Sequence, residues 1–220
     1  MKLLLGSLLM LGAFLAVSLW TFWLAVRPPR VLIGATPRDH GLAGEDVRIS
    51  TRDGLRLAAW FIPSSEGTGA NGAIVLLHGY PAEKADLLPI AAALHPRFAT
   101  LLVDLRYFGG SEGNVTTLGH REREDVQRAV DALGQRGFAH IGVFGYSLGG
   151  AIALLAAAED RRIGAVVAYA PFSDLRLLAR RRPDQDAGWT DGEPERPEAH
   201  GQERQDQEEE PAEKLHPRGI

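Results

Sequence analysis

The chain has 220 residues, of which 45% are hydrophobic and 24% are charged, and its formal net charge is −4 at pH 7. This length is sufficient for one ordinary domain with a hydrophobic core. The absence of cysteine excludes disulfides, thiolate nucleophiles and cysteine-bound zinc. The sequence contains no basic patch with interleaved aromatic residues, and it therefore gives no sign of a nucleic-acid partner.

The amino-terminal segment is almost entirely apolar. Residues 3–26 carry no charge, and a helix of that length, at about 1.5 Å per residue, would cross a hydrocarbon core about 30 Å thick. Trp20 and Trp23 lie near its end, where aromatic rings favour the membrane interface. A cleaved signal peptide is the alternative, although its apolar region is normally only about 7–15 residues long. We therefore expect a single-pass transmembrane anchor over 1–27 and a linker over 28–43, with the side of the globular domain left open.

Residues 44–180 alternate between strand-like and helical patterns. The pair Asp53-Gly54 between two strand-like runs favours a β-hairpin. Later apolar runs rich in Val, Ile and Leu are typical of strands covered on both faces. The expected strands are 46–51, 55–62, 73–77, 99–103, 141–144 and 163–169, and the expected helices are 83–94, 118–133 and 148–158. This order predicts an α/β domain with a doubly wound, mostly parallel sheet.

The helix expected over 118–133 has two features of its own. Thr117 is placed to cap its start. The charged run 121–125 indicates a solvated helix face, with a partner-binding surface as the alternative. The small, apolar helix over 148–158 is expected to be buried.

The most informative motif is Gly-x-Ser-x-Gly, between an expected strand and an expected helix. Gly145 and Gly149 flank Ser147 at two residues on either side. A serine held on so sharp a turn needs neighbours without side chains at these positions. The turn would place Ser147 at a helix amino terminus, where the N–H of Leu148 can stabilise an oxyanion. The motif therefore predicts a nucleophile at Ser147, a glycine-rich turn being the alternative.

Further motifs carry a resemblance to a known family. The stretch 104–113 resembles the Asp-x-Arg-Gly-x-Gly-x-Ser motif of the α/β-hydrolase superfamily, and within it the membrane-anchored Bem46-like and serine-aminopeptidase-like hydrolases. Tyr107 stands where the first glycine is usual. The matching positions are Asp104, Arg106, Gly109 and Ser111, and the segments 53–55 and 169–174 also resemble this family.

The resemblance implies a serine hydrolase of the α/β-hydrolase type that cleaves an ester, thioester or amide bond through an acyl-enzyme. Ser147 would attack, and the N–H groups of Leu148 and Tyr80 would hold the oxyanion. Gly79 and His78 precede Tyr80 at the end of a strand, and His78 is expected to be structural. No cofactor or metal is implied. The substrate would be a small-molecule, peptide or lipid acyl compound, with membrane contact through the amino-terminal helix.

The residues that should complete a catalytic triad are not identifiable. In this fold the acid and then the histidine follow the serine in the chain. The segment 181–220 has 12 acidic and 6 basic residues, and we expect it to be a charged, disordered tail. Its candidates are therefore left unassigned: Asp184, Asp186, Asp191, Asp206, His200 and His216.

Two hypotheses account for the change of composition near 178–182. The tail is either a frameshifted or prematurely ended part of a longer hydrolase, or an authentic tail on a degenerate domain. Either would leave a partial α/β-hydrolase domain over 44–180, with an exposed sheet edge and impaired activity. The alternative to an enzyme is a non-catalytic pseudo-hydrolase that serves as a membrane-tethered binding module.

Overall fold

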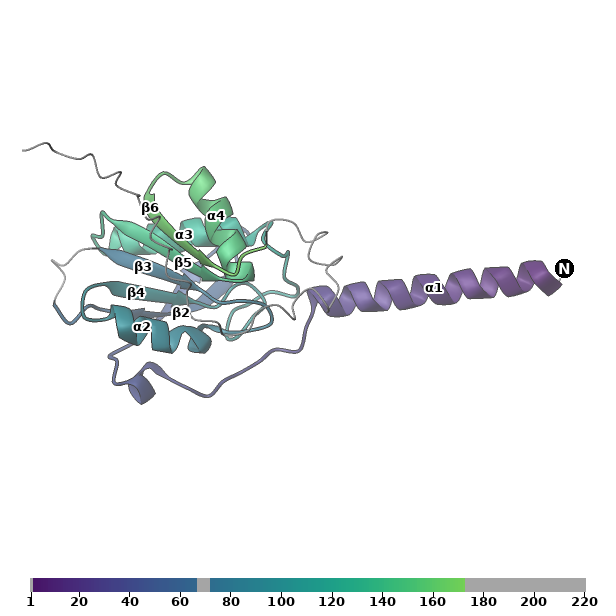
Figure 1. Cartoon of the computed structure of the whole chain (residues 1–220), viewed down its shortest axis with the longest axis horizontal. Coiled ribbons are helices and arrows are strands. Elements are labelled where there is room, and N and C mark those ends of the chain that lie inside the picture. The colour runs from purple at the N-terminus through teal and green to yellow at the C-terminus, as the bar shows by residue number, and fades with distance from the viewer. Residues whose placement is uncertain (1, 67–71, 173–220) are drawn as a thin grey trace, which may run out of the picture. The chain divides into compact units, whose positions relative to one another are not determined.

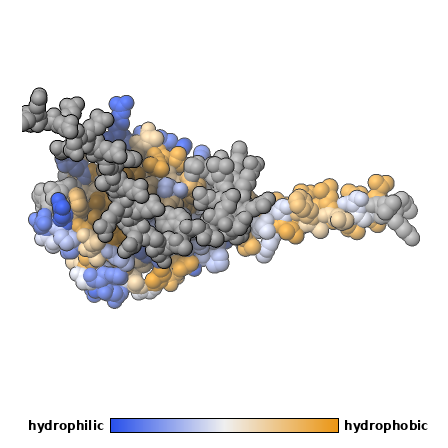
Figure 2. All heavy atoms as spheres, viewed as in Figure 1, coloured by the Kyte–Doolittle hydropathy of each residue, from blue (hydrophilic) through white to orange (hydrophobic). Residues whose placement is uncertain are grey.

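The computed structural model describes residues 2–66 and 72–172 (Figure 1). Helix α1 spans Lys2–Val26, and apolar side chains line its surface (Figure 2). Its segment Leu4–Val26 is long and apolar enough to cross a membrane, and none of it is buried in the protein. A signal sequence meets the same criteria of length and composition, so the prediction of an apolar amino-terminal helix is confirmed and its role is not decided.

A six-stranded mixed sheet forms the centre of the domain, in the order β1-β2-β4-β3-β5-β6. Its strands are β1 (Glu45–Ser50), β2 (Arg56–Ile62), β3 (Ala73–Leu77), β4 (Ala99–Val103), β5 (Ile141–Tyr146) and β6 (Ile163–Tyr169). The predicted hairpin joins β1 to β2 in antiparallel register, with Gly54 at φ 87°. Strand β2 is also antiparallel to β4, whereas β4, β3, β5 and β6 run parallel.

Helices cover both faces of the sheet, because successive strand side chains point to opposite faces. Val75, Leu77 and Val143 pack in one core with α3 (Glu122–Gln135) and α4 (Leu148–Glu159). Leu76 and Leu102 face the other way and pack against the 3₁₀ helix η2 (Lys84–Leu87) and helix α2 (Leu88–Leu94). This is the doubly wound arrangement that the alternating pattern predicts.

The start of α3 differs from its prediction. The helix begins at Glu122 rather than Leu118, and Thr117 is not its cap. Leu118 and Gly119 both have positive φ, which interrupts a helix at this point. Thr117 instead donates from its backbone N–H and its hydroxyl to the Glu122 carboxylate.

The charged run on α3 is also not simply a solvated face. Glu122 and Asp125 are buried. Glu122 accepts hydrogen bonds from the loop that precedes the helix, and Asp125 pairs with Arg106 on the loop after β4. The interpretation of these two residues as solvated is therefore wrong. Hydrogen bonds from the preceding loop compensate the burial of Glu122, and the Arg106 charge compensates the burial of Asp125.

The described part of the domain ends at an exposed edge. Strand β6 lies at the side of the sheet, and its Val167 and Tyr169 are exposed, as are Leu154 and Leu155 on the outer face of α4. The prediction of a buried helix over 148–158 therefore holds for only one face of α4. The expected linker over 28–43 contains the short 3₁₀ helix η1 (Pro37–His40), and Pro37 and Leu42 pack into the domain.

Candidate active site

The sheet brings the two predicted site loops to the same edge. Strands β3 and β5 are parallel neighbours, with Leu77 paired to Gly145, so the loops that follow them emerge side by side. The chain leaves β3 towards β4 on one side and returns to β5 on the other. Ligands of open α/β sheets bind at such a switch point, beyond the carboxyl ends of the strands.

Ser147 lies at the junction between β5 and α4 with an unusual backbone. Its φ is 49° and its ψ is −111°, a conformation that residues with side chains rarely adopt. Its N–H donates to Tyr169 O at 2.8 Å, and its carbonyl accepts the N–H of Ala151 at 3.1 Å as the helix begins. The side chain is half-buried. The neighbouring strand and the first turn of α4 thus hold the strained turn in place.

The flanking glycines permit this turn because their backbones are in tight contact. A Cβ on Gly145 would lie 2.2 Å from Gly149 O, and a Cβ on Gly149 would lie 2.4 Å from Leu77 O. A Cβ on Gly79 would lie 2.9 Å from the Tyr146 ring and 3.4 Å from Ser147 Cβ. The loop after β3 is therefore packed directly against the Ser147 turn.

His78 is fully buried beneath this loop. Its Nε2 accepts the Leu105 N–H at 3.0 Å, and its Nδ1 lies 2.7 Å from Gly79 O. This pattern fits a neutral imidazole that carries its proton on Nδ1. Burial lowers the pKa of His78 below its ordinary value, outweighing the nearby carbonyl and carboxylates. With both ring nitrogens engaged, His78 fixes the positions of two loops.

The loop after β4 is held by buried polar contacts. Asp104 accepts from the Lys84 N–H at 2.7 Å and from Lys84 Nζ at 2.6 Å, and the Gly110 N–H also donates to it. Ser111 Oγ donates to Asp104 O at 2.7 Å and accepts the Ala58 N–H at 2.8 Å. These contacts engage the side chains of Asp104 and Ser111 and stabilise the loop.

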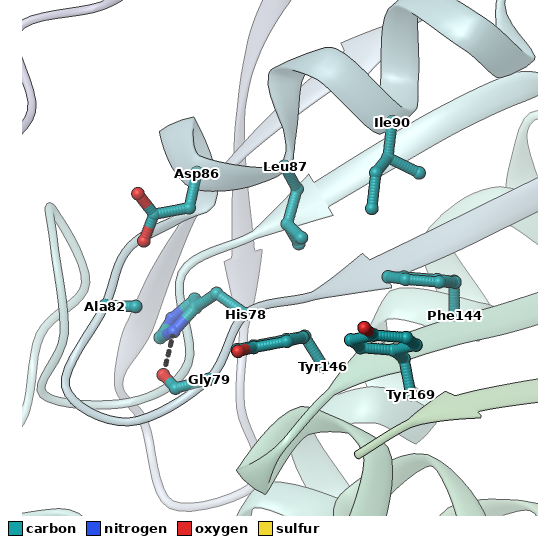
Figure 3. A pocket seen from close by; sticks show the side chains of 9 residues that line it. All are labelled: His78, Gly79, Ala82, Asp86, Leu87, Ile90, Phe144, Tyr146 and Tyr169. Atoms are coloured by element: carbon teal, nitrogen blue, oxygen red, sulfur yellow. Dashed lines mark hydrogen bonds between the residues drawn. The ribbon is translucent and has the colours of Figure 1, made fainter. Parts of the chain in front are cut away.

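A cavity of about 520 Å³ lies on the α2 face of the sheet, next to the Ser147 turn (Figure 3). Leu87 and Ile90 line one side, opposite the rings of Phe144, Tyr146 and Tyr169. The Tyr146 and Tyr169 rings stack with their centroids 5.6 Å apart. The wall is mainly apolar, which suits the hydrocarbon part of an acyl group.

Sequence analysis singled out His78 and Gly79, which line this cavity, but missed the aromatic and aliphatic residues of its wall. Tyr169 ends the expected strand 163–169, and Tyr146 lies between the expected strand 141–144 and Ser147; these positions were the signal that could have identified them. The candidates for the triad acid and base, and the expected tail over 181–220, lie outside the described residues. Among the residues that the structure describes, no cluster of His, Asp or Glu suited to holding a metal occurs.

Comparison with known proteins agrees with this geometry. Residues 72–209 match the model of the alpha/beta hydrolase fold family, and this match extends past 182 into the expected tail. The polyketide transferase ATR5 of Stachybotrys chlorohalonatus is 41% identical over 140 residues, which are 60% of this chain and 46% of the relative. The thiohydrolase aneE of Aspergillus aculeatus is 32% identical over 147 residues, 63% of this chain and 45% of the relative.

A solved structure shows the same architecture. The Pyrococcus furiosus esterase Pf2001 superposes with a TM-score of 0.61 at 31% identity, over 66% of this chain and 57% of the esterase. The chain spans about half the length of the curated relatives it matches. The match to the family model covers more than half of the chain, and the chain therefore belongs to the alpha/beta hydrolase fold family.

Proposed function

We propose that this chain is a serine hydrolase that cleaves ester or thioester bonds through an acyl-enzyme at Ser147. The single observation that carries the proposal is the strained backbone of Ser147, at φ 49° and ψ −111°, between β5 and α4. Strain of this kind costs about 1–3 kcal/mol and is characteristic of functional turns. The adjoining apolar cavity of about 520 Å³ supplies room for an acyl group.

The chemistry follows from the position of the serine. The hydroxyl of Ser147 gives its proton to a general base, for which this fold uses a histidine, and its oxygen attacks the acyl carbonyl. The carbonyl oxygen gains the negative charge, which the N–H groups of Leu148 and Tyr80 stabilise. The alcohol or thiol leaves with the transferred proton, and water then hydrolyses the acyl-enzyme by the same steps in reverse.

Two observations support these substrate classes. The Pyrococcus furiosus structure is that of an esterase, and the Aspergillus aculeatus relative is a thiohydrolase. The same chemistry would cleave an amide or peptide bond, but neither of these two proteins supports that substrate class. The apolar segment Leu4–Val26 of helix α1 would anchor the enzyme in a membrane.

A fluorophosphonate probe tests the proposal, because it reacts with an activated serine. Full-length wild-type protein should be labelled, and Ser147→Ala should not be. Ser65→Ala is the matched control, because it alters an exposed serine outside the Ser147 turn. This variant should be labelled to the same extent as the wild type. If folded wild-type protein is not labelled, the hydrolase proposal fails.

The non-catalytic alternative predicts that the site binds an acyl compound and does not react with it. Absence of probe labelling, together with saturable binding of an acyl compound that Tyr146→Ala weakens, would support a binding module instead. Tyr146 is the appropriate variant because its ring forms part of the cavity wall.

A further inference from the structure

The end of helix α1 contacts two loops at the edge of the sheet that carries Ser147. The segment 25–30, here called the docking segment, accepts a hydrogen bond from Tyr80 Oη to Ala25 O at 2.8 Å. The Thr116 N–H donates to Val26 O at 3.0 Å. Pro28 is buried, whereas residues 4–25 are exposed. The chain is therefore packed onto the domain from the last turn of α1 onwards.

Two arginines extend this contact. Arg27 Nε donates to Asn114 O at 2.5 Å, and Arg30 Nη2 donates to Gly113 O at 3.1 Å. Arg30 Nη1 lies 3.5 Å from Gly109 O. Guanidinium groups bound to backbone carbonyls in this way fix the loop 109–116 relative to the docking segment.

Tyr107 gives the strongest indication that the contact with the docking segment has a function. It has φ 75°, in the left-handed region where a residue with a Cβ costs about 1–2 kcal/mol. Its hydroxyl donates to Pro28 O at 2.6 Å, and the Arg30 guanidinium lies 5.0 Å from the centre of its ring. A glycine would be less strained here and would lose both contacts. The side chain thus compensates for an unfavourable backbone by binding the docking segment.

Tyr80 connects the docking segment to the site itself. Its hydroxyl binds Ala25 O, and its backbone belongs to the loop packed against the Ser147 turn. Its ring meets the buried Phe108 edge to face at 5.8 Å, and Phe108 contacts His78 in the same way at 5.4 Å. The contacts from the helix end to the oxyanion loop are therefore continuous.

We propose that the docking segment holds the opening of the Ser147 site against the bilayer surface, so that the acyl donor is an ester or thioester lipid taken from the membrane. This inference rests on the proposed function and on α1 as a membrane span. A spanning helix that ends at Val26 places Ala25 at the lipid interface, and Tyr80 lies within hydrogen-bond distance of it.

The surface at this edge fits an interfacial location. Val115, between the two loop residues Asn114 and Thr116, is exposed, and so are Tyr146 and Tyr169 at the cavity wall. Amphipathic rings favour the headgroup region. Arg27 and Arg30 add the positive charge that anionic headgroups attract. Exposed apolar side chains beside a hydrophobic helix end are better explained by a lipid surface than by water.

The absence of cysteine permits a direct test, since a single introduced cysteine will carry a single fluorophore. Full-length protein in vesicles would be labelled at Asn114→Cys, in the docked loop, or at Gln135→Cys, at the far end of α3. Lipids with a nitroxide on the headgroup should quench the Asn114 label at least threefold more than the Gln135 label. Tyr107→Phe, which removes one hydroxyl, should reduce that difference by at least half. Equal quenching at the two positions would overturn the proposal.

A second arm tests the source of the substrate. A fluorogenic long-chain acyl ester embedded in the same vesicles should be hydrolysed at least fivefold more slowly by Tyr107→Phe than by wild type. The same fluorophore on a short acyl chain, dissolved in the buffer, should be affected less. Equal losses on both substrates would contradict a lipid-borne donor.

The two arms separate this inference from the proposed function. Quenching is measured with Ser147→Ala as the background, and it therefore does not depend on catalysis. Fluorophosphonate labelling without the quenching difference would leave the hydrolase and remove the docking at the membrane. A quenching difference without fluorophosphonate labelling would support the docking at the membrane and reject the hydrolase, and with it the lipid substrate.

Discussion

Arg106 and Asp125 form a buried, bidentate ion pair, in which Arg106 Nε and Nη2 lie 2.7 and 2.6 Å from the two oxygens of the Asp125 carboxylate. Arg106 belongs to the loop after β4, and Asp125 to the first turn of α3. Arg106 also binds Asp53 of the β1–β2 turn at 2.9 Å. The guanidinium therefore holds three segments together: the β1–β2 turn, the loop after β4 and the start of α3.

Removing one partner of this pair should be costly. Asp125→Ala leaves the Arg106 charge buried without its main partner, and we expect the free energy of unfolding to fall by about 3–5 kcal/mol. Asp131→Ala, on the same helix, breaks two exposed ion pairs and should cost less than about 1 kcal/mol. Urea unfolding followed by circular dichroism measures both. Similar costs for the two variants would contradict the structural role of Arg106.

Two of the helical glycines, Gly149 and Gly134, offer a matched pair. In Gly149→Ala the new Cβ would lie 2.4 Å from Leu77 O and 2.6 Å from His78 O, both backbone atoms that cannot move independently. We expect a loss of more than about 2 kcal/mol and no probe labelling. In Gly134→Ala the Cβ meets nothing within 4 Å, and the higher helix propensity of alanine should stabilise the protein by about 0.5–1 kcal/mol. Unimpaired folding of Gly149→Ala would show that the turn is not held as described.

Substitutions of Ser147 should abolish probe labelling without reducing the stability of the fold. Ser147→Gly relieves a φ of 49° that a residue with a Cβ adopts with strain, so the free energy of unfolding should rise by about 1 kcal/mol. Ser147→Ala keeps the Cβ and should leave stability within about 0.5 kcal/mol of wild type. Both variants should lose fluorophosphonate labelling. A Ser147→Gly protein no more stable than Ser147→Ala would refute the assignment of strain to this position.

Acid should destabilise the protein through His78. Burial depresses the pKa of His78 in the folded state, so below about pH 6.5 the unfolded chain binds a proton that the folded chain resists. This contribution to stability is present above that pH and is lost as the pH falls below it. Unfolding free energies of wild type at pH 7.5 and 5.5 should show the loss.

His78→Gln is the control, because glutamine keeps hydrogen-bonding atoms and does not titrate. Its stability should change less over the same pH range than that of wild type. The carboxylates of Asp104 and Asp86 face His78 in both proteins and cancel in the comparison. An identical pH dependence in both proteins would assign the effect to other groups.

Much of the sheet could be predicted from the sequence. Three strands, Ala73–Leu77, Ala99–Val103 and Ile163–Tyr169, have the predicted bounds. They are continuous apolar runs between polar loops, and such runs have few alternatives to a covered parallel strand. The Asp53-Gly54 hairpin and the strand–turn–helix around Ser147 also depend on neighbours within a few residues, since glycine spacing and backbone sterics act locally.

What the sequence determined by itself was the order of strands and helices, the apolar amino-terminal helix and the turn at Ser147, because each depends on local periodicity or local backbone freedom. Only the tertiary structure decided that Asp125 is buried against Arg106, that Tyr146 and Tyr169 wall a cavity with Leu87 and Ile90, and that Tyr107 binds Pro28. These are contacts between segments distant in the chain. Their energies depend on which surfaces the fold brings together, and no local pattern encodes that choice.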